Sequence, residues 1–106
     1  MNAVGRLWRA VEARDWRSAA MQLHPNVTIE RPHEARRYTR SEDYVAAWKA
    51  TPEDQVVTVS EFLSEHKIVA VLARIDRGAD VLHCAAFYEL QDGRIARGTE
   101  VWSAQA

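Results

Sequence analysis

The chain has 106 residues and a mass of 12.1 kDa, so we expect residues 1–106 to form one domain. Its 14 lysines and arginines nearly balance its 15 aspartates and glutamates, which excludes the basic surface typical of nucleic-acid-binding and anionic-lipid-binding proteins. The single cysteine, Cys84, cannot form an internal disulfide, and no apolar run has the length of a membrane span. We therefore expect a cytoplasmic protein with no nucleic-acid or membrane partner.

The N-terminal part predicts two consecutive helices. Apolar side chains recur at helical spacing over about residues 2–14, and the same spacing returns from Trp16 to about residue 23. Asp15 between them is suited to cap the second helix, and the pair His24-Pro25 predicts its end. The apolar positions of the first stripe are Val4, Leu7, Trp8 and Val11.

A strand and a third helix are predicted next. Residues 26–32 alternate in polarity and end at a proline, which predicts a short strand with Val27, Ile29 and Arg31 on one face. Thr39 and Glu42 have the spacing of a capping box, which predicts a helix from about residue 40 to residue 50.

From residue 56 onward the pattern changes to the period of two that is typical of strands. We expect four successive strands over residues 56–63, 68–77, 81–90 and 95–103, because turn-forming residues separate them. The predicted order is α-α-β-α-β-β-β-β. This order indicates an α+β domain with a curved, mainly antiparallel sheet and helices on one face.

The turn Asp92-Gly93 predicts how the last two strands pair. A two-residue turn there places Glu100 opposite Ala85, and His83 opposite Trp102. The face that carries Glu100 then combines bulky aromatic residues with small ones, which is the expected construction of a small-molecule pocket. The predicted residues of this face are His83, Ala85, Phe87, Glu89, Ala96, Gly98, Glu100 and Trp102.

The other face of these strands is apolar enough to predict a homodimer through the sheet, and Cys84 would lie on it as a packing or interface residue. A pairing displaced by one residue is the open alternative, and it would turn Glu100 and His83 to solvent and bury Tyr88. The apolar residues of the predicted dimer face are Leu82, Ala86, Tyr88, Leu90, Ile95 and Val101.

Four segments, residues 12–16, 23–32, 86–95 and 100–102, together resemble the SnoaL-like branch of the nuclear transport factor 2-like superfamily. The resemblance covers nearly the whole chain. It implies a cone-shaped fold, a pocket between the helices and the curved sheet, and homodimerisation through the other sheet face. The family includes polyketide cyclases, ketosteroid isomerases, epoxide hydrolases and proteins with no known reaction, so the resemblance does not specify an activity.

The resemblance does argue against one mechanism. Ketosteroid isomerases use a carboxylate base before the proline, together with a tyrosine and a carboxylic acid that bind the developing oxyanion. The matching positions in this chain are Arg31, Leu7 and Ala85, and none of them can perform those roles.

For a reaction in the predicted pocket, the candidate catalytic residues are Glu100, His83 and Arg31. Glu100 or His83 would transfer a proton while Arg31 stabilises negative charge. The structural alternative is that Glu100 and Arg31 form a buried ion pair and that His83 is a hydrogen-bonded core residue. The candidate ligand-binding residues are Trp16, Tyr44, Trp48, Phe87 and Trp102, although the aromatic residues of the helices are more simply explained as core.

We interpret the sequence as that of a small-molecule-binding protein with a semi-apolar pocket. If it is an enzyme, we expect cofactor-free acid–base catalysis of the isomerase, cyclase or hydrolase type on an apolar carbonyl- or hydroxyl-bearing compound. The alternative is a noncatalytic ligand-binding or dimerisation domain. The dispersed histidines and the lone cysteine predict no metal site, and nothing in the sequence indicates a cofactor.

Overall fold

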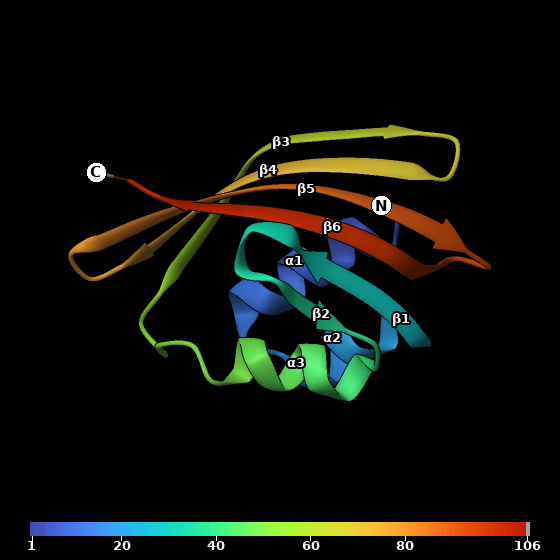
Figure 1. Cartoon of the computed structure of the whole chain (residues 1–106), viewed down its shortest axis with the longest axis horizontal. Coiled ribbons are helices and arrows are strands. Elements are labelled where there is room, and N and C mark those ends of the chain that lie inside the picture. The colour runs from blue at the N-terminus through green and yellow to red at the C-terminus, as the bar shows by residue number, and fades with distance from the viewer. Residues whose placement is uncertain (106) are drawn as a thin grey trace.

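The computed structural model describes residues 1–105, which form three helices and a mixed six-stranded sheet in the order β2-β1-β6-β5-β4-β3. Four long strands make one curved layer, and all three helices lie on the same side of it (Figure 1). The predicted α+β architecture is confirmed. The long strands are β3 (Val56–Glu65), β4 (Ile68–Arg77), β5 (Asp80–Gln91) and β6 (Arg94–Ala104).

Two of the three helices begin at a side chain that caps them. In α1 (Ala3–Ala13) the Asn2 side chain accepts hydrogen bonds from the first turn, and in α2 (Trp16–Met21) Asp15 does so, as predicted. The capping box predicted for α3 (Ser41–Lys49) is wrong, because Arg40 occupies the N-cap and provides no side-chain hydrogen bond. None of the helices within residues 1–105 is long and apolar enough to cross a membrane.

The segment after α2 is more extended than its sequence suggests. Strand β1 (Leu23–Arg31) already includes Pro25, which the chain tolerates because the parallel pairing with β6 is irregular between Leu23 and Thr28. After the short 3-10 helix η1 (Pro32–Glu34), strand β2 (Arg36–Tyr38) turns back and pairs with β1. The sequence pattern did not predict β2, because three residues are too few to show a period of two.

The pairing of β5 with β6 starts as predicted and then shifts. The turn at residues 92–93 has positive φ at both positions, and Leu90 lies opposite Ile95 as expected. The pairing then shifts by one residue at Ala96, which makes a β-bulge. Every pair beyond the bulge is therefore displaced from the prediction.

Because of this displacement, the β5 side chains predicted to face inward face outward and the others face inward. The β6 residues beyond the bulge keep their predicted face. Glu100 lies opposite Ala86 and not Ala85, and Trp102 lies opposite Cys84. Both Glu100 and Trp102 are buried beneath the sheet, as predicted, but the β5 residues that accompany them are the opposite set. The β5 residues that turn inward are Cys84, Ala86 and Tyr88, and those that turn outward are His83, Ala85 and Phe87.

Gly98 provides the space that the Tyr88 ring occupies. A Cβ atom at position 98 would lie 2.7 Å from Tyr88 Cδ1 and 2.8 Å from Ile29 Cδ1. Both neighbours are fully buried and have nowhere to move. The missing side chain at this position is therefore required for the packing of the inner face.

We expect Gly98→Ala to lower the free energy of unfolding by about 1–3 kcal/mol, because it overpacks the core at Tyr88. Gly5→Ala is the matched control, since its new Cβ meets mainly the exposed Met1 side chain and alanine favours helix α1. Urea denaturation of the two variants should give changes of opposite sign. Equal stability of both variants would contradict the packing role of Gly98.

Candidate functional site

A fully buried carboxylate lies at the centre of the structure. The Glu100 side chain is 0% exposed, and its two oxygens accept four hydrogen bonds. Oε1 accepts from Arg31 Nε at 3.0 Å and from Trp102 Nε1 at 3.2 Å. Oε2 accepts from the Tyr44 hydroxyl at 2.5 Å and from the Tyr88 hydroxyl at 2.8 Å. Because arginine and the indole only donate, this set of partners suits the ionised carboxylate.

The donors converge from separate elements of the fold. Arg31 ends β1, Tyr44 lies in α3 and Tyr88 lies in β5. Glu100 and Trp102 are two residues apart on β6, so they share one face of that strand. The carboxylate thus connects the helical layer to three strands of the sheet, and its position depends on the whole fold.

The two tyrosine hydroxyls donate to Glu100 and stay protonated. Burial raises the pKa of Tyr44 well above its ordinary value, and the negative charge of Glu100 raises it further. The same two causes, in the same order, raise the pKa of Tyr88. Both hydroxyls therefore remain protonated at neutral pH and available to Glu100.

Arg31 belongs to this buried network and also lines a cavity next to it. Its guanidinium carbon lies 5.3 Å from the Tyr38 ring centroid and 5.1 Å from that of Trp102, so two aromatic rings flank the cation. Burial opposes the charged form, but the attraction of Glu100 and the neighbouring tyrosines outweighs it and raises the pKa of Arg31. Only Nε has a hydrogen-bond partner within residues 1–105, so the terminal nitrogens remain available to a ligand.

An open cavity of about 330 Å³ borders this network. The Trp48 and Trp102 rings form one aromatic wall, with centroids 5.6 Å apart, and Trp8 supports Trp48 from behind at the same distance. Glu100 does not line the cavity, but two of its donors, Arg31 and Trp102, do. The lining residues are Arg31, His33, Glu34, Ala47, Trp48, Thr51, Arg77, Leu82, Trp102, Ser103 and Ala104.

The structure brings five of the eight sequence-predicted residues together. Arg31, Trp48 and Trp102 line the cavity, while Glu100 and Tyr44 form the network behind it. The structural alternative from the sequence, an ion pair between Arg31 and Glu100, is present in the structure.

The other three predicted residues lie elsewhere. His83 is half-buried on the outer face of the sheet, where its Nε2 is 3.0 Å from the Gln105 side-chain oxygen. Phe87 is 60% exposed on the same outer face, because the bulge in β6 turns both residues away from the helices. Trp16 packs beneath the Arg14 guanidinium, 5.0 Å from it, and does not line the cavity. Within residues 1–105, no group of three acidic, histidine or cysteine side chains is arranged to hold a metal ion.

Sequence reasoning missed three participants. The predicted face of Tyr88 is wrong, because a residue pattern does not reveal a bulge. Tyr38 lies in β2, the strand that was too short to predict, and Arg77 reaches the cavity from the end of β4. Only Tyr88 had a signal, since the pairing displaced by one residue would have buried it.

Comparisons with known proteins agree with this architecture. The sequence matches the family described as SnoaL-like domain over residues 4–98. A provisionally named ketosteroid isomerase from Kribbella flavida is 27% identical, with a TM-score of 0.90 over 98% of this chain and 76% of that chain. A provisionally named polyketide cyclase from Sinorhizobium meliloti is 20% identical, with a TM-score of 0.75 over 92% of both chains.

A third similar structure is a nuclear transport factor 2-like protein of unknown function from Cytophaga hutchinsonii. It is 18% identical and has a TM-score of 0.82, with 95% of this chain and 87% of that chain covered. A search of curated proteins finds no match. The solved structures thus share one fold, while their names differ in the reaction or state none.

The buried tyrosines predict a loss of stability at alkaline pH. Above about pH 10 the unfolded chain releases the protons of Tyr44 and Tyr88, but the folded chain retains them because their pKa values are raised. The free energy of unfolding should therefore fall with pH, by about 1.4 kcal/mol per pH unit for each tyrosine. Tyr88→Phe should reduce this slope relative to the wild type in urea denaturation at several pH values. An unchanged slope would contradict the assignment.

Proposed function

Because the chain belongs to the SnoaL-like domain family, we propose that its cavity binds a small molecule and that Arg31 holds an oxygen atom of the ligand. The observation that carries this proposal is the orientation of Arg31, which uses Nε for Glu100 and keeps its terminal nitrogens free within residues 1–105. Hydrogen-bond donors in an open aromatic cavity require an acceptor, which water or a ligand supplies.

The remainder of the cavity suits an apolar body. Its volume of about 330 Å³ can hold a compound of one or two rings, and the walls include Trp48, Leu82 and Trp102. Flat ligands pack well against such aromatic surfaces. The ligand that fits best therefore has a compact apolar part and an oxygen acceptor at the Arg31 end.

Glu100 serves in this proposal as a positioning residue. Its side chain is 0% exposed and both of its oxygens already have two donors, so it has no free site from which to accept a proton from a ligand. A reaction in this cavity would rely on Arg31, which can stabilise negative charge that develops on a carbonyl oxygen. The neighbouring structures are named for different reactions, so we do not transfer any one of them to this chain.

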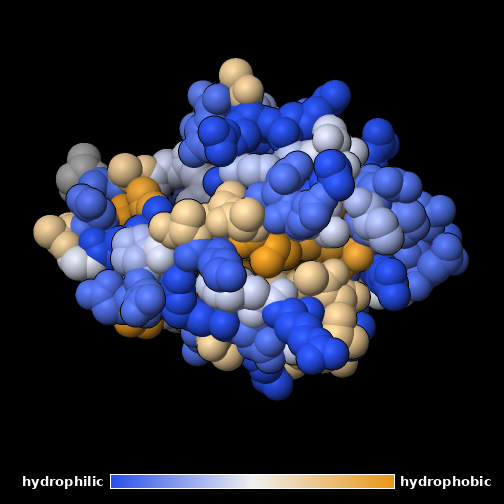
Figure 2. Space-filling view, turned by 90° about the horizontal axis from the view of Figure 1, so that it is seen from below, coloured by the Kyte–Doolittle hydropathy of each residue, from blue (hydrophilic) through white to orange (hydrophobic). Residues whose placement is uncertain are grey.

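We also propose that the protein forms a homodimer through the outer face of the sheet. Four large apolar side chains, from β3, β4, β5 and β6, are substantially exposed there, whereas the surface seen from the helical side is hydrophilic around a central apolar band (Figure 2). A contiguous apolar sheet face is typical of a protein–protein interface. The four residues are Leu63 (68% exposed), Leu72 (43%), Phe87 (60%) and Val101 (50%).

Filling the cavity should weaken ligand binding. Ala47 lines the cavity from α3, so Ala47→Phe is expected to occupy the space of the ligand's apolar part. Ala46→Phe is the matched control, because Ala46 is exposed on the same helix. Binding of naphthalene-2-carboxaldehyde, followed by tryptophan fluorescence, should weaken at least tenfold in Ala47→Phe and remain unchanged in Ala46→Phe. A failure of the wild type to bind this and related two-ring compounds would contradict the proposal.

A single charge on the outer face should dissociate the proposed dimer. Light scattering should give the wild type twice the monomer mass of 12.1 kDa at micromolar concentration, and Phe87→Glu the monomer mass, because the change buries a charge in an apolar interface. Met21→Glu is the control, since Met21 is 64% exposed on α2 and lies outside this face. A monomeric wild type would overturn the dimer.

A further inference from the structure

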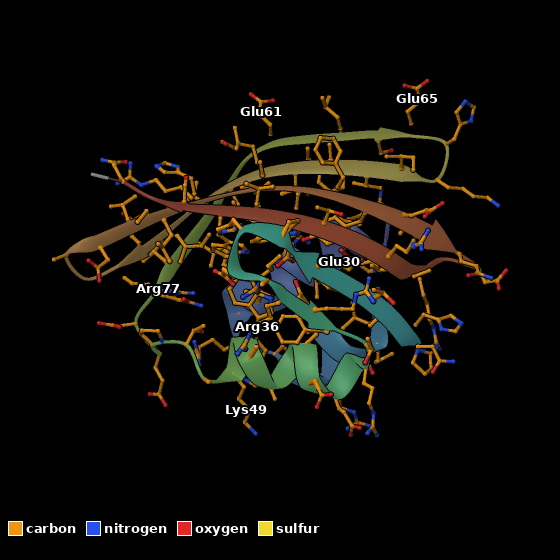
Figure 3. The ribbon with its side chains drawn as sticks, in the orientation of Figure 1. Glu30, Arg36, Lys49, Glu61, Glu65 and Arg77 are labelled. Atoms are coloured by element: carbon orange, nitrogen blue, oxygen red, sulfur yellow. The ribbon has the colours of Figure 1, made fainter. Side chains whose placement is uncertain are left out.

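A second arginine lines the cavity, and within residues 1–105 its charge has no ion-pair partner. Arg77 ends β4 and lines the cavity, and its Nε donates to the Gln55 side-chain oxygen at 2.9 Å. It forms no ion pair with any carboxylate in residues 1–105. Figure 3 shows Arg77 beneath the sheet on the helical side, whereas Glu61 and Glu65 project from the opposite side.

Three arginines in this part of the fold each pair with a carboxylate. Arg74, three residues earlier on β4, pairs with Asp76 at 2.9 Å, and Arg37 on β2 pairs with Glu30 at 2.9 Å. Arg31 has Glu100. Arg77 is thus a half-buried cation in the cavity wall, and a second arginine, Arg31, lines the same cavity.

The surroundings of Arg77 disfavour its charged form. Burial lowers the pKa of Arg77, and the positive charge of Arg31 lowers it further. An anion in the cavity would offset both effects. It would accept the hydrogen bonds that Arg77 loses from water, and its negative charge between Arg77 and Arg31 would reduce their repulsion. Glu34 is the acidic residue that lines the cavity, but its side chain is 42% exposed at the rim and lies 3.8 Å from His33.

We propose that the ligand is a carboxylic acid, bound as the carboxylate between Arg77 and Arg31. This inference rests on the proposed function, because it names the oxygen acceptor of the same ligand. A planar guanidinium matches the two oxygens of a carboxylate, and Arg77 has its terminal nitrogens free within residues 1–105 to present that geometry. The apolar body of the acid then packs against Trp102, which lines the cavity beside Arg31.

The test compares two probes of the same shape, naphthalene-2-carboxylate and naphthalene-2-carboxamide. Calorimetric titration at pH 7 and low salt should show the wild type binding the carboxylate at least tenfold more tightly than the neutral amide. Arg77→Gln should remove this preference by weakening carboxylate binding alone, and Arg77→Lys should retain part of it. Arg74→Gln, on the outer face of the same strand, is the matched control and should bind both probes like the wild type.

The two probes separate this inference from the proposed function. If the wild type binds both compounds equally, or if Arg77→Gln keeps the full preference for the carboxylate, the carboxylate assignment is overturned while small-molecule binding stands. If the wild type binds neither compound, the proposed function itself fails. Circular dichroism melting of each variant verifies that it is folded, and Arg77→Lys provides the comparison if Arg77→Gln does not fold.

Discussion

The buried carboxylate of Glu100 is the constraint on which the rest of the structure depends. An ionised group without water is tolerated only when it is fully hydrogen-bonded, and here four donors complete its shell. These donors come from β1, α3, β5 and β6, so the requirement of one side chain specifies how four elements meet. Removing any one donor would leave a buried charge partly unsatisfied. The pairing of strands and the placement of α3 are therefore coupled through a single residue.

The same constraint determines what the cavity presents to a ligand. Glu100 accepts a hydrogen bond from Nε of Arg31, and the rings of Tyr38 and Trp102 flank the guanidinium. The orientation of the terminal nitrogens is therefore restricted on three sides. In this ion pair the negative charge of Glu100 is fully buried, whereas the positive charge of Arg31 is partly accessible. Arg77, which lacks such a partner within residues 1–105, makes the cavity more positive than the overall charge of −1 suggests. A near-neutral composition says little about the sign of one concave site.

A one-residue bulge at Ala96 gives the sheet its two different faces. Beyond the bulge Tyr88 turns inward toward Glu100, and Phe87 turns outward among exposed apolar neighbours. Gly98 opposite Tyr88 leaves the volume that the ring requires. The inner network and the apolar outer face are therefore consequences of the same local irregularity. Without the bulge, the strand would present the predicted set of residues to each side.

The sequence alone determined the three helices, the long strands and their order, because these depend on periodicity and turn chemistry that are local. It also placed Glu100 and Trp102 on one face of the last strand and offered an ion pair between Glu100 and Arg31 as the structural alternative. It did not determine the face of β5, the short strand β2 or the approach of Arg77 to the cavity. A bulge gives no distinctive residue pattern, and which side chains share a cavity depends on how strands bend and helices dock. Those features were decided by tertiary packing, which in the case of β5 places Tyr88 where it donates to the buried Glu100.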